Sequence, residues 1–196
     1  MRVVLASRNA HKLDELRRIL GESVPGLELV GDDGDGPVEN GLTFEANALI
    51  KARDAAERTG LPAIADDSGI CVDVLGGAPG IFSARWAGPG RSDADNLELL
   101  RWQLTDVPDE ARGAQFVCAA ALVVPGGREV AVRGVWPGRI ARERAGEGGF
   151  GYDPIFVPEG EARSSAELAP AEKDALSHRR RAFEALAPEL RALAEG

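Results

Sequence analysis

The 196-residue sequence lacks the features of several specialised protein classes. It has only two cysteines, Cys71 and Cys118, which excludes a disulfide framework and leaves two small apolar residues in β-rich segments. No apolar run reaches the roughly 18 residues that a membrane-spanning helix needs, and the apolar start at residues 1–7 is too short for a secretory leader. We therefore expect a cytoplasmic protein with no membrane partner.

Several common catalytic motifs are also missing. His11 and His178 are the only histidines and no C-x-x-C occurs, so a zinc site would lack its usual ligands. No lysine follows a glycine and no serine lies in G-x-S-x-G, which excludes a P-loop and the α/β-hydrolase nucleophile motif. Residues 146–151 fit G-x-G-x-x-G by letters, but Tyr152–Phe156 follow where a dinucleotide fold needs a helix.

The charge balance is acidic. With 23 basic and 32 acidic residues the net charge is −9, and no block of lysine or arginine offsets it. We therefore expect no general nucleic-acid-binding surface. An anionic ligand would need a local group of cations.

Short apolar runs alternate with segments of helical spacing, which predicts an α/β fold. The apolar run 114–124, the turn 125–128 and the alternating segment 129–136 predict an antiparallel hairpin, so the sheet is expected to be mixed. Strands are also expected at residues 2–5, 27–30, 63–65, 70–75 and 155–157, with residues 66–69 forming an acidic turn. Helices are expected after Asn9 as N-cap, at 43–58, at 92–104, and at 177–186 with a break at Pro188.

Lysine is rare and its positions are informative. It occurs only at positions 12, 51 and 173, although the chain has 23 basic residues. Lys12 starts the first predicted helix after a polar loop, where free backbone N–H groups and the helix dipole favour an anion. The first loop is therefore a candidate phosphate site.

Two adjacent carboxylates, Asp66 and Asp67, follow a short apolar strand. Carboxylate oxygens suit a hard cation, and because adjacent side chains on a strand diverge, we expect one of the two to bind it. Glu39 and Glu45 are the nearest acidic candidates to complete such a site.

Two later segments suit recognition of a ring. Gly148–Pro154 combines glycines that permit close approach of a ligand with Phe150 and Tyr152, either of which offers a stacking face. Ser177–Arg179 opens the last helix with two side chains that can donate to a carbonyl on a base. Taken singly, each segment also fits an ordinary turn or a capped helix.

Taken in order, these segments resemble the inosine triphosphate pyrophosphatase-like family, the dITP/XTP pyrophosphatases that remove non-canonical purine nucleotides. The resemblance runs nearly from end to end of the chain. The matching segments are Ser7–Lys12, Thr43–Ala52, Ala65–Gly69, Leu75–Gly80, Gly148–Pro154 and Ser177–Arg179.

The resemblance implies a fold, a reaction and partners. The fold would be an elongated mixed β-sheet flanked by helices in two lobes, with a nucleotide cleft between them and residues 1–196 forming a single domain. The reaction would be hydrolysis of ITP, dITP and XTP to the monophosphate and pyrophosphate, with Mg²⁺ as cofactor. The resemblance further implies a cytoplasmic homodimer whose only other partner is the purine nucleotide.

The resemblance also implies roles for particular residues. Asp67 would be both the base and a metal ligand, unless the proton leaves a metal-bound water instead. Val38 stands where the family has a metal-binding glutamate, so either Glu39 or water takes that place. His178 and Arg179 would face O6 of the purine. The substrate-binding residues implied are Ser7, Arg8, Asn9, Ala10, His11, Lys12, Ser68, Phe150, Gly151, Tyr152, Asp153, Lys173, His178 and Arg179.

Two other functions stay open from the sequence. One is a Maf-type pyrophosphatase, which acts on modified pyrimidine or 7-methylguanine nucleotides; Ser177–Arg179 and Gly148–Pro154 argue against it. The other is a nucleotide-binding regulator without turnover, for which Val38 is the only indication.

Overall fold

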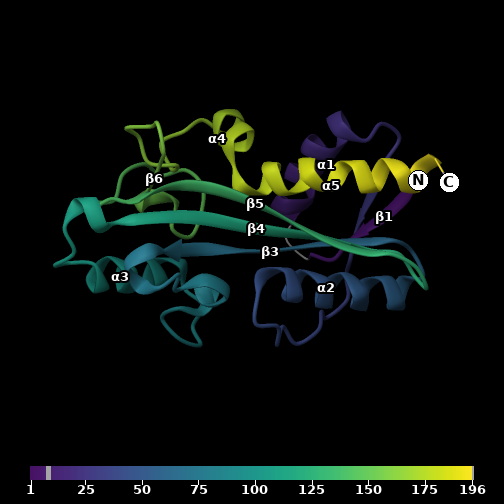
Figure 1. Cartoon of the computed structure of the whole chain (residues 1–196), viewed down its shortest axis with the longest axis horizontal. Coiled ribbons are helices and arrows are strands. Elements are labelled where there is room, and N and C mark those ends of the chain that lie inside the picture. Colours follow the sequence, from purple (N-terminus) through teal and green to yellow (C-terminus); the bar gives the residue numbers. More distant parts are fainter. Residues whose placement is uncertain (8–9, 196) are drawn as a thin grey trace. The chain divides into compact units, whose positions relative to one another are not determined.

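A computed structural model of the chain describes residues 1–7 and 10–195 and contains one six-stranded sheet of order β2-β1-β3-β4-β5-β6 (Figure 1). β1 pairs in parallel with β2 and β3, whereas β6 is antiparallel to β5. The predicted mixed sheet is therefore confirmed. The strands are β1 Arg2–Leu5, β2 Glu28–Gly31, β3 Ala63–Val72, β4 Gly113–Val123, β5 Glu129–Ile140 and β6 Phe156–Pro158.

The two central predicted helices begin at side-chain caps. Thr43 accepts from the Ala46 backbone N–H and Ser92 from that of Asp95, which satisfies donors that a helix start leaves unpaired. The α-helices are α1 Ala10–Ser23, α2 Phe44–Thr59, α3 Asp93–Gln103, α4 Pro170–Leu176 and α5 His178–Glu195. Short 3₁₀ helices are η1 Asp73–Leu75, η2 Gly80–Arg85, η3 Asp109–Ala111 and η4 Asp153–Ile155.

The contacts divide the chain into two compact units. Unit 1 comprises residues 1–67, 118–134 and 179–196, and unit 2 comprises residues 68–117 and 135–178. β3, β4 and β5 each contribute residues to both units. The expectation that residues 1–196 form a single domain stays a prediction.

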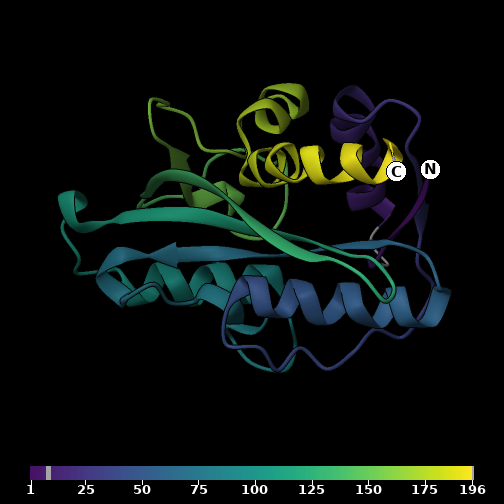
Figure 2. The same cartoon turned by 45° about the vertical axis from the view of Figure 1, so that its right-hand side comes forward.

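In unit 1, helices cover both faces of the sheet. α1 and α5 lie on one face and α2 lies on the other (Figures 1 and 2). The buried apolar side chains of α1 and α5 form one cluster with those of the strands, including Leu16, Ile19, Phe183, Leu186 and Ile64. The small apolar side chains of α2 are buried as well, so its alanine-rich face packs closely on the sheet.

The core of unit 2 is richer in aromatic side chains. Leu97 and Leu100 of α3 and the C-cap residue Leu104 are fully buried, and the same cluster contains Phe116, Trp136, Tyr152 and Phe156. Figures 1 and 2 show α3 on one side of this part of the sheet and α4 on the other.

A buried arginine ties the ends of two elements together in unit 2. The Arg112 guanidinium donates to the backbone carbonyls of Leu104 at 2.6 Å, Ile140 at 2.8 Å and Ala141 at 3.1 Å. Burial lowers the Arg112 pKa from its ordinary value, and the nearby positive charge of Arg142 lowers it further. Backbone carbonyls thus accept from the guanidinium, and the negative charge of Asp109 partly offsets the lowering of its pKa.

Three sequence predictions were wrong and one helix was missed. The strand expected at residues 70–75 ends at Val72, where η1 begins. Residues 66–69 are not a turn, because β3 runs unbroken from Ala63 to Val72 through both aspartates. Helix α5 does not break at Pro188 but continues past it. The proline costs the helix one backbone hydrogen bond, and burial of Leu186, Ala187 and Leu190 on either side of it compensates for this loss. α4 was not expected at all. The predicted cap Asn9 lies outside the described residues.

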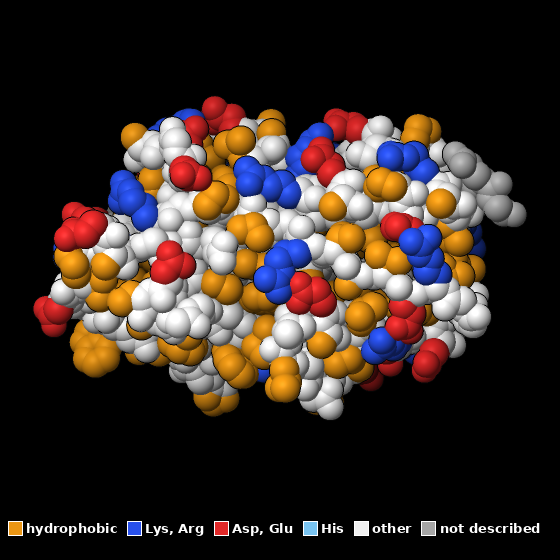
Figure 3. Space-filling model, viewed as in Figure 1, with side chains coloured by type: hydrophobic (Ala, Val, Ile, Leu, Met, Phe, Trp, Pro, Cys, Tyr) orange, Lys and Arg blue, Asp and Glu red, His pale blue; other side chains and the backbone are white. Residues whose placement is uncertain are grey.

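The surface carries mixed charge. On the face seen in Figure 3, acidic and basic side chains lie close to one another and no single sign dominates. Among the residues that the structure describes, no helix has both the length and the apolar composition needed to cross a membrane.

Candidate active site

The two aspartates of β3 bind different helices. Asp66 contacts Lys12 of α1 and Arg179 of α5, whereas Asp67 contacts Asn47 and Lys51 of α2. Alternate side chains of a strand point to opposite faces, and here those faces are covered by α1 with α5 and by α2. The expected divergence of the two carboxylates is therefore confirmed.

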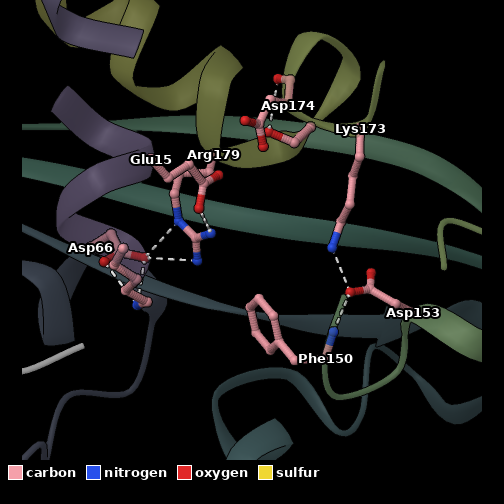
Figure 4. Close-up of polar contacts among 9 residues, drawn as sticks. Glu15, Asp66, Phe150, Asp153, Lys173, Asp174 and Arg179 are labelled. Carbon is pink, nitrogen blue, oxygen red and sulfur yellow. Dashed lines mark hydrogen bonds and ion pairs between the residues drawn. The ribbon is translucent and has the colours of Figure 1, made fainter. Parts of the chain in front are cut away.

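Asp66 is the centre of a buried ion-pair cluster in unit 1 (Figure 4). Both of its oxygens lie 2.9 Å from Lys12 Nζ, and Oδ2 lies 3.5 Å from Nε and Nη2 of Arg179. Arg179 Nη1 also donates to Glu15 at 2.8 Å, and its side chain is only 5% exposed. Burial would raise the Asp66 pKa, but Lys12, Arg179 and Lys51 outweigh it and hold that pKa well below its ordinary value.

Asp67 forms a second, partly buried cluster in unit 1. Its Oδ2 accepts from the Asn47 amide at 3.1 Å, and its Oδ1 lies 3.3 Å from Lys51 Nζ. The same ammonium lies 3.1 Å from Glu39 Oε2. Burial raises the pKa of Asp67 above its ordinary value, and the negative charge of Glu39 adds to this effect. Burial lowers the Lys51 pKa, but Asp67, Asp66 and Glu39 outweigh it and leave that pKa raised.

The Asp67 cluster has the donors for a hard divalent cation. Asp67 and Glu39 come from separate segments, yet both carboxylates reach Lys51 Nζ. Mg²⁺ commonly takes one or two carboxylates and completes its shell with water and substrate phosphates. Within residues 1–7 and 10–195, no three His, Cys, Asp or Glu side chains group to hold a metal, so a closed, all-protein cage is not formed. The two carboxylates therefore fit a hard divalent cation as an open site.

In unit 2, Asp153 organises the glycine-rich loop (Figure 4). The buried carboxylate accepts from Ser165 Oγ at 2.7 Å, from the Phe150 backbone N–H at 2.8 Å, and from Lys173 Nζ. A Cβ on Gly149 would lie 2.1 Å from Asp153 Oδ2, and its φ of +72° also favours glycine. Close contact with the Asp153 carboxylate thus favours glycine at position 149.

The two aromatic residues of this loop have different environments. Phe150 is 59% exposed, and Lys173 Nζ lies 5.2 Å from its ring centroid. Tyr152 is buried, and its hydroxyl donates to the Ser83 carbonyl at 2.7 Å. Burial raises the Tyr152 pKa, with a smaller contribution from Asp93. Of the two candidate stacking faces, the exposed one is Phe150. The Gly151 backbone N–H donates to Asp93 at 3.1 Å.

His178 starts α5 and packs against aromatic rings of unit 2. Its imidazole stacks on Phe116 with centroids 4.9 Å apart and on Trp136 at 6.4 Å, with interplanar angles of 13° and 17°. His178 is buried and ends unit 2, whereas its neighbour Arg179 belongs to unit 1. The two expected base-reading residues therefore have unrelated contacts.

The remaining predicted site residues lie near the start of α1 and on β3. Ser7 follows β1 and is half-buried, and Ser68 follows Asp67 on β3 and is also half-buried. Ala10 and His11 begin α1, but their side chains, like the whole of Arg8 and Asn9, lie outside what the structure describes.

Four residues of these clusters were missed as site residues in the sequence: Glu15, Asn47, Lys51 and Ser165. Asn47 and Lys51 are four apart on a predicted helix, so a shared helix face was a usable signal. Lys51 was also one of only three lysines. Nothing local in the sequence distinguishes Glu15 or Ser165, because their partners are distant along the chain.

The fold and the clusters together define an α/β protein with lysines and carboxylates suited to a phosphorylated ligand and a divalent cation. The chain belongs to the Ham1 family, whose model matches residues 3–189. This match confirms the family that the sequence motifs indicate.

Proteins similar to this chain span its full length. A Leifsonia xyli protein named dITP/XTP pyrophosphatase is 61% identical over 98% of this chain and 97% of its own length. A Mycobacterium bovis protein of the same name is 58% identical over 100% of this chain and 98% of its own length. A Ham1 protein structure from Coxiella burnetii matches with TM-score 0.89 and 41% identity, covering both chains fully. A structure from Mycobacterium abscessus, described as nucleoside-triphosphatase / dITP/XTP pyrophosphatase, matches with TM-score 0.79 and 55% identity. The match covers 96% of this chain and 100% of that chain.

Proposed function

We propose that this protein hydrolyses non-canonical purine nucleoside triphosphates, dITP, ITP and XTP, to the monophosphate and pyrophosphate. The proposal rests on its membership of the Ham1 family and on full-length relatives named dITP/XTP pyrophosphatase. The structural observation that carries it is the Asp67 cluster, where a partly buried carboxylate lies beside Lys51, Asn47 and Glu39. Such a group of charges suits the displacement of a phosphoryl group.

Lysines and a carboxylate are proposed to bind the triphosphate and to move a proton. Lys12 at the start of α1 and Lys51 on α2 are the cations available to phosphate oxygens, together with residues 7–11 of the first loop. Asp67 is the proposed acceptor for the proton of the attacking water, unless that proton leaves a metal-bound water instead. Ser68 contacts the nucleotide beside it.

Asp67 and Glu39 would hold Mg²⁺ with water completing its shell. When bound, Mg²⁺ neutralises phosphate charge and lowers the pKa of coordinated water. Glu39 takes this role because the preceding Val38 has no ligating atom and is exposed. Lys51 balances the two carboxylates and keeps both oriented toward the same point.

Phe150 and His178 are proposed to recognise the base. The exposed Phe150 ring stacks on the purine, and His178 donates to its 6-oxo group. Asp153 and Lys173 hold the loop of Phe150, Gly151 and Tyr152 in shape. A site built to donate to a carbonyl disfavours adenine, whose amino group would leave the donor unpaired, by about 10⁴-fold. Arg179, which also lies beside Asp66, is proposed with His178 as a donor to the 6-oxo group.

The resemblance further supports a homodimer in the cytoplasm, built of one domain over residues 1–196 and without a nucleic-acid partner. Gel filtration with light scattering tests the dimer directly: a monomer at micromolar concentration contradicts it.

A substrate panel with Mg²⁺ tests the activity. ITP, dITP, XTP, GTP, ATP and pyrimidine triphosphates are assayed separately for pyrophosphate and orthophosphate. We expect pyrophosphate as first product, with the three non-canonical purines cleaved best. Strong ATP cleavage, or orthophosphate as first product, contradicts the proposal. Tight binding of a non-hydrolysable ITP analogue without turnover of ITP would instead identify a regulator.

A further inference from the structure

Three aromatic rings of unit 2 and the His178 imidazole form a compact group. Phe116 of β4 and Trp136 of β5 both lie nearly parallel to the imidazole, at interplanar angles of 13° and 17°. Phe156 of β6 meets Phe116 at 65° and Trp136 at 64°, with centroids 4.6 Å and 5.5 Å away. We call Phe116 and Trp136 the ring platform.

The ring platform is rigid. Phe116, Trp136 and Phe156 are buried and lie on three strands that neighbour one another in the sheet. Phe156 contacts both platform rings edge to face, an arrangement that aromatic quadrupoles favour. The platform rings therefore have little freedom to tilt, and a ring stacked on them inherits their orientation.

Stacking on the ring platform fixes the plane of the His178 imidazole and so limits the directions of its hydrogen bonds. The imidazole nitrogens form hydrogen bonds in the plane of the ring, so the orientation of that plane decides which direction a donor faces. Rotation about χ2 would exchange the stacked contact with Phe116, whose centroid is 4.9 Å away, for an edge contact and would turn both nitrogens in other directions. An aliphatic side chain of similar volume would bury His178 equally well but would not fix its plane.

We propose that Phe116 and Trp136 are specificity-determining positioning residues, which select the 6-oxo purine by fixing the plane of the His178 imidazole. The proposal rests on the proposed function, in which His178 donates to the base. Neither platform residue is expected to touch the nucleotide. Their effect is on base discrimination, and chemistry at phosphorus is left unchanged.

The test compares aliphatic and aromatic substitutions. Phe116→Leu and Trp136→Leu remove a stacking face, whereas Trp136→Phe keeps one. We expect each leucine variant to reduce the ratio of kcat/KM for ITP to that for ATP by about tenfold, the size of one lost aromatic contact. KM for ITP rises while kcat with ITP changes little, and Trp136→Phe retains most of the wild-type ratio.

Two controls separate positioning from general damage. Phe183→Leu makes the same change in the core of unit 1, so it matches the loss of volume and should leave the ITP to ATP ratio unchanged. In a His178→Ala background, the platform substitutions should no longer change that ratio. An equal change with and without His178, or wild-type ratios in both leucine variants, overturns the proposal.

An NMR measurement needs no variant to be active. The chain has two histidines, so a His178→Gln variant assigns the signals. We expect the carbon-bound protons of His178 to be shifted upfield by ring currents in the wild type. Signals at the positions of a free histidine overturn the platform. If the wild-type enzyme fails to cleave ITP while these shifts are present, the proposed function fails and the platform geometry stands.

Discussion

Lys51 and Asp67 form an ion pair that joins α2 to β3, with Nζ 3.3 Å from Oδ1. Glu39 shares the ammonium at 3.1 Å, so one cation lies between two carboxylates. Under the proposed function, a phosphate bound to Lys51 would compete with these acids, and a divalent cation bound to the acids would release the lysine for the phosphate. The arrangement couples the two kinds of ligand through one side chain.

Asp67→Asn should abolish turnover and leave the fold intact. The amide keeps the shape and an oxygen for Asn47, but it accepts no proton from water and balances no cation. We expect kcat for ITP to fall by at least about 10²-fold, as for loss of a general base. Release of pyrophosphate measures it, with circular dichroism to check the fold. The exposed Glu143→Gln is the matched control, and full activity of Asp67→Asn would remove Asp67 from the mechanism.

Glu39→Gln should raise the Mg²⁺ concentration required for half-maximal activity. The amide is a weaker ligand for Mg²⁺ than the carboxylate, so an increase of at least about tenfold is expected, with kcat at saturating Mg²⁺ partly retained. Titration of ITP cleavage with MgCl₂ measures this, and removal of the metal with EDTA should stop the reaction. Val38→Ala, at the exposed neighbouring residue, is expected to titrate like the wild type. Identical Mg²⁺ curves for Glu39→Gln and wild type would count against Glu39 as a ligand.

Arg112→Lys should destabilise the protein although it keeps the charge. A single ammonium cannot reach the carbonyls of Leu104, Ile140 and Ala141 together, so buried acceptors lose their donors. We expect the free energy of unfolding to fall by about 2 kcal/mol or more. Urea unfolding followed by fluorescence measures the change. Arg144→Lys, whose side chain is half exposed, should change stability by less than about 0.5 kcal/mol.

Asp153→Asn should loosen the glycine-rich loop. The amide oxygen can still accept from Ser165, but the Phe150 N–H and Lys173 lose their shared acceptor. We expect a loss of about 1–3 kcal/mol in the free energy of unfolding and a raised KM for ITP. Asp109→Asn, an exposed ion-pair partner of Arg142, provides the comparison in unfolding and kinetic assays. A wild-type KM in Asp153→Asn would show that the loop needs no such support.

The Glu45–Arg133 pair should make stability depend on pH. The hydrogen bond from Arg133 lowers the Glu45 pKa from its ordinary value of 4.5. A carboxylate with a lowered folded pKa contributes stability above its unfolded pKa and loses it as the pH falls through the folded pKa. Arg133→Gln should therefore lower Tm at about pH 7 and have a smaller effect at about pH 3. Equal shifts of Tm at both pH values would exclude this linkage.

Local patterns predicted most of the helices and strands. The helix after Thr43 and the helix after Ser92 begin where capping chemistry places them, and the apolar run 114–124 is β4. The same rules wrongly predicted a turn at residues 66–69, because aspartate, serine and glycine favour turns unless tertiary partners hold them in a strand. Lys12, Arg179, Lys51 and Asn47 are those partners. The helix break predicted at Pro188 was wrong for a related reason. Burial of the side chains around the proline outweighs the one hydrogen bond that it removes.

The sequence by itself determined the family, the mixed α/β sheet and the segments that carry chemistry, because these follow from local spacing and residue type. Tertiary structure alone decided which charges meet. Asp66 and Asp67 are neighbours in the chain, yet strand alternation sends one to Lys12 and Arg179 and the other to Lys51. His178 and Arg179 are neighbours too, and packing places one on aromatic rings and the other in an ion-pair cluster. Partners far apart in sequence become neighbours only when strands and helices pack, and no local pattern encodes that choice.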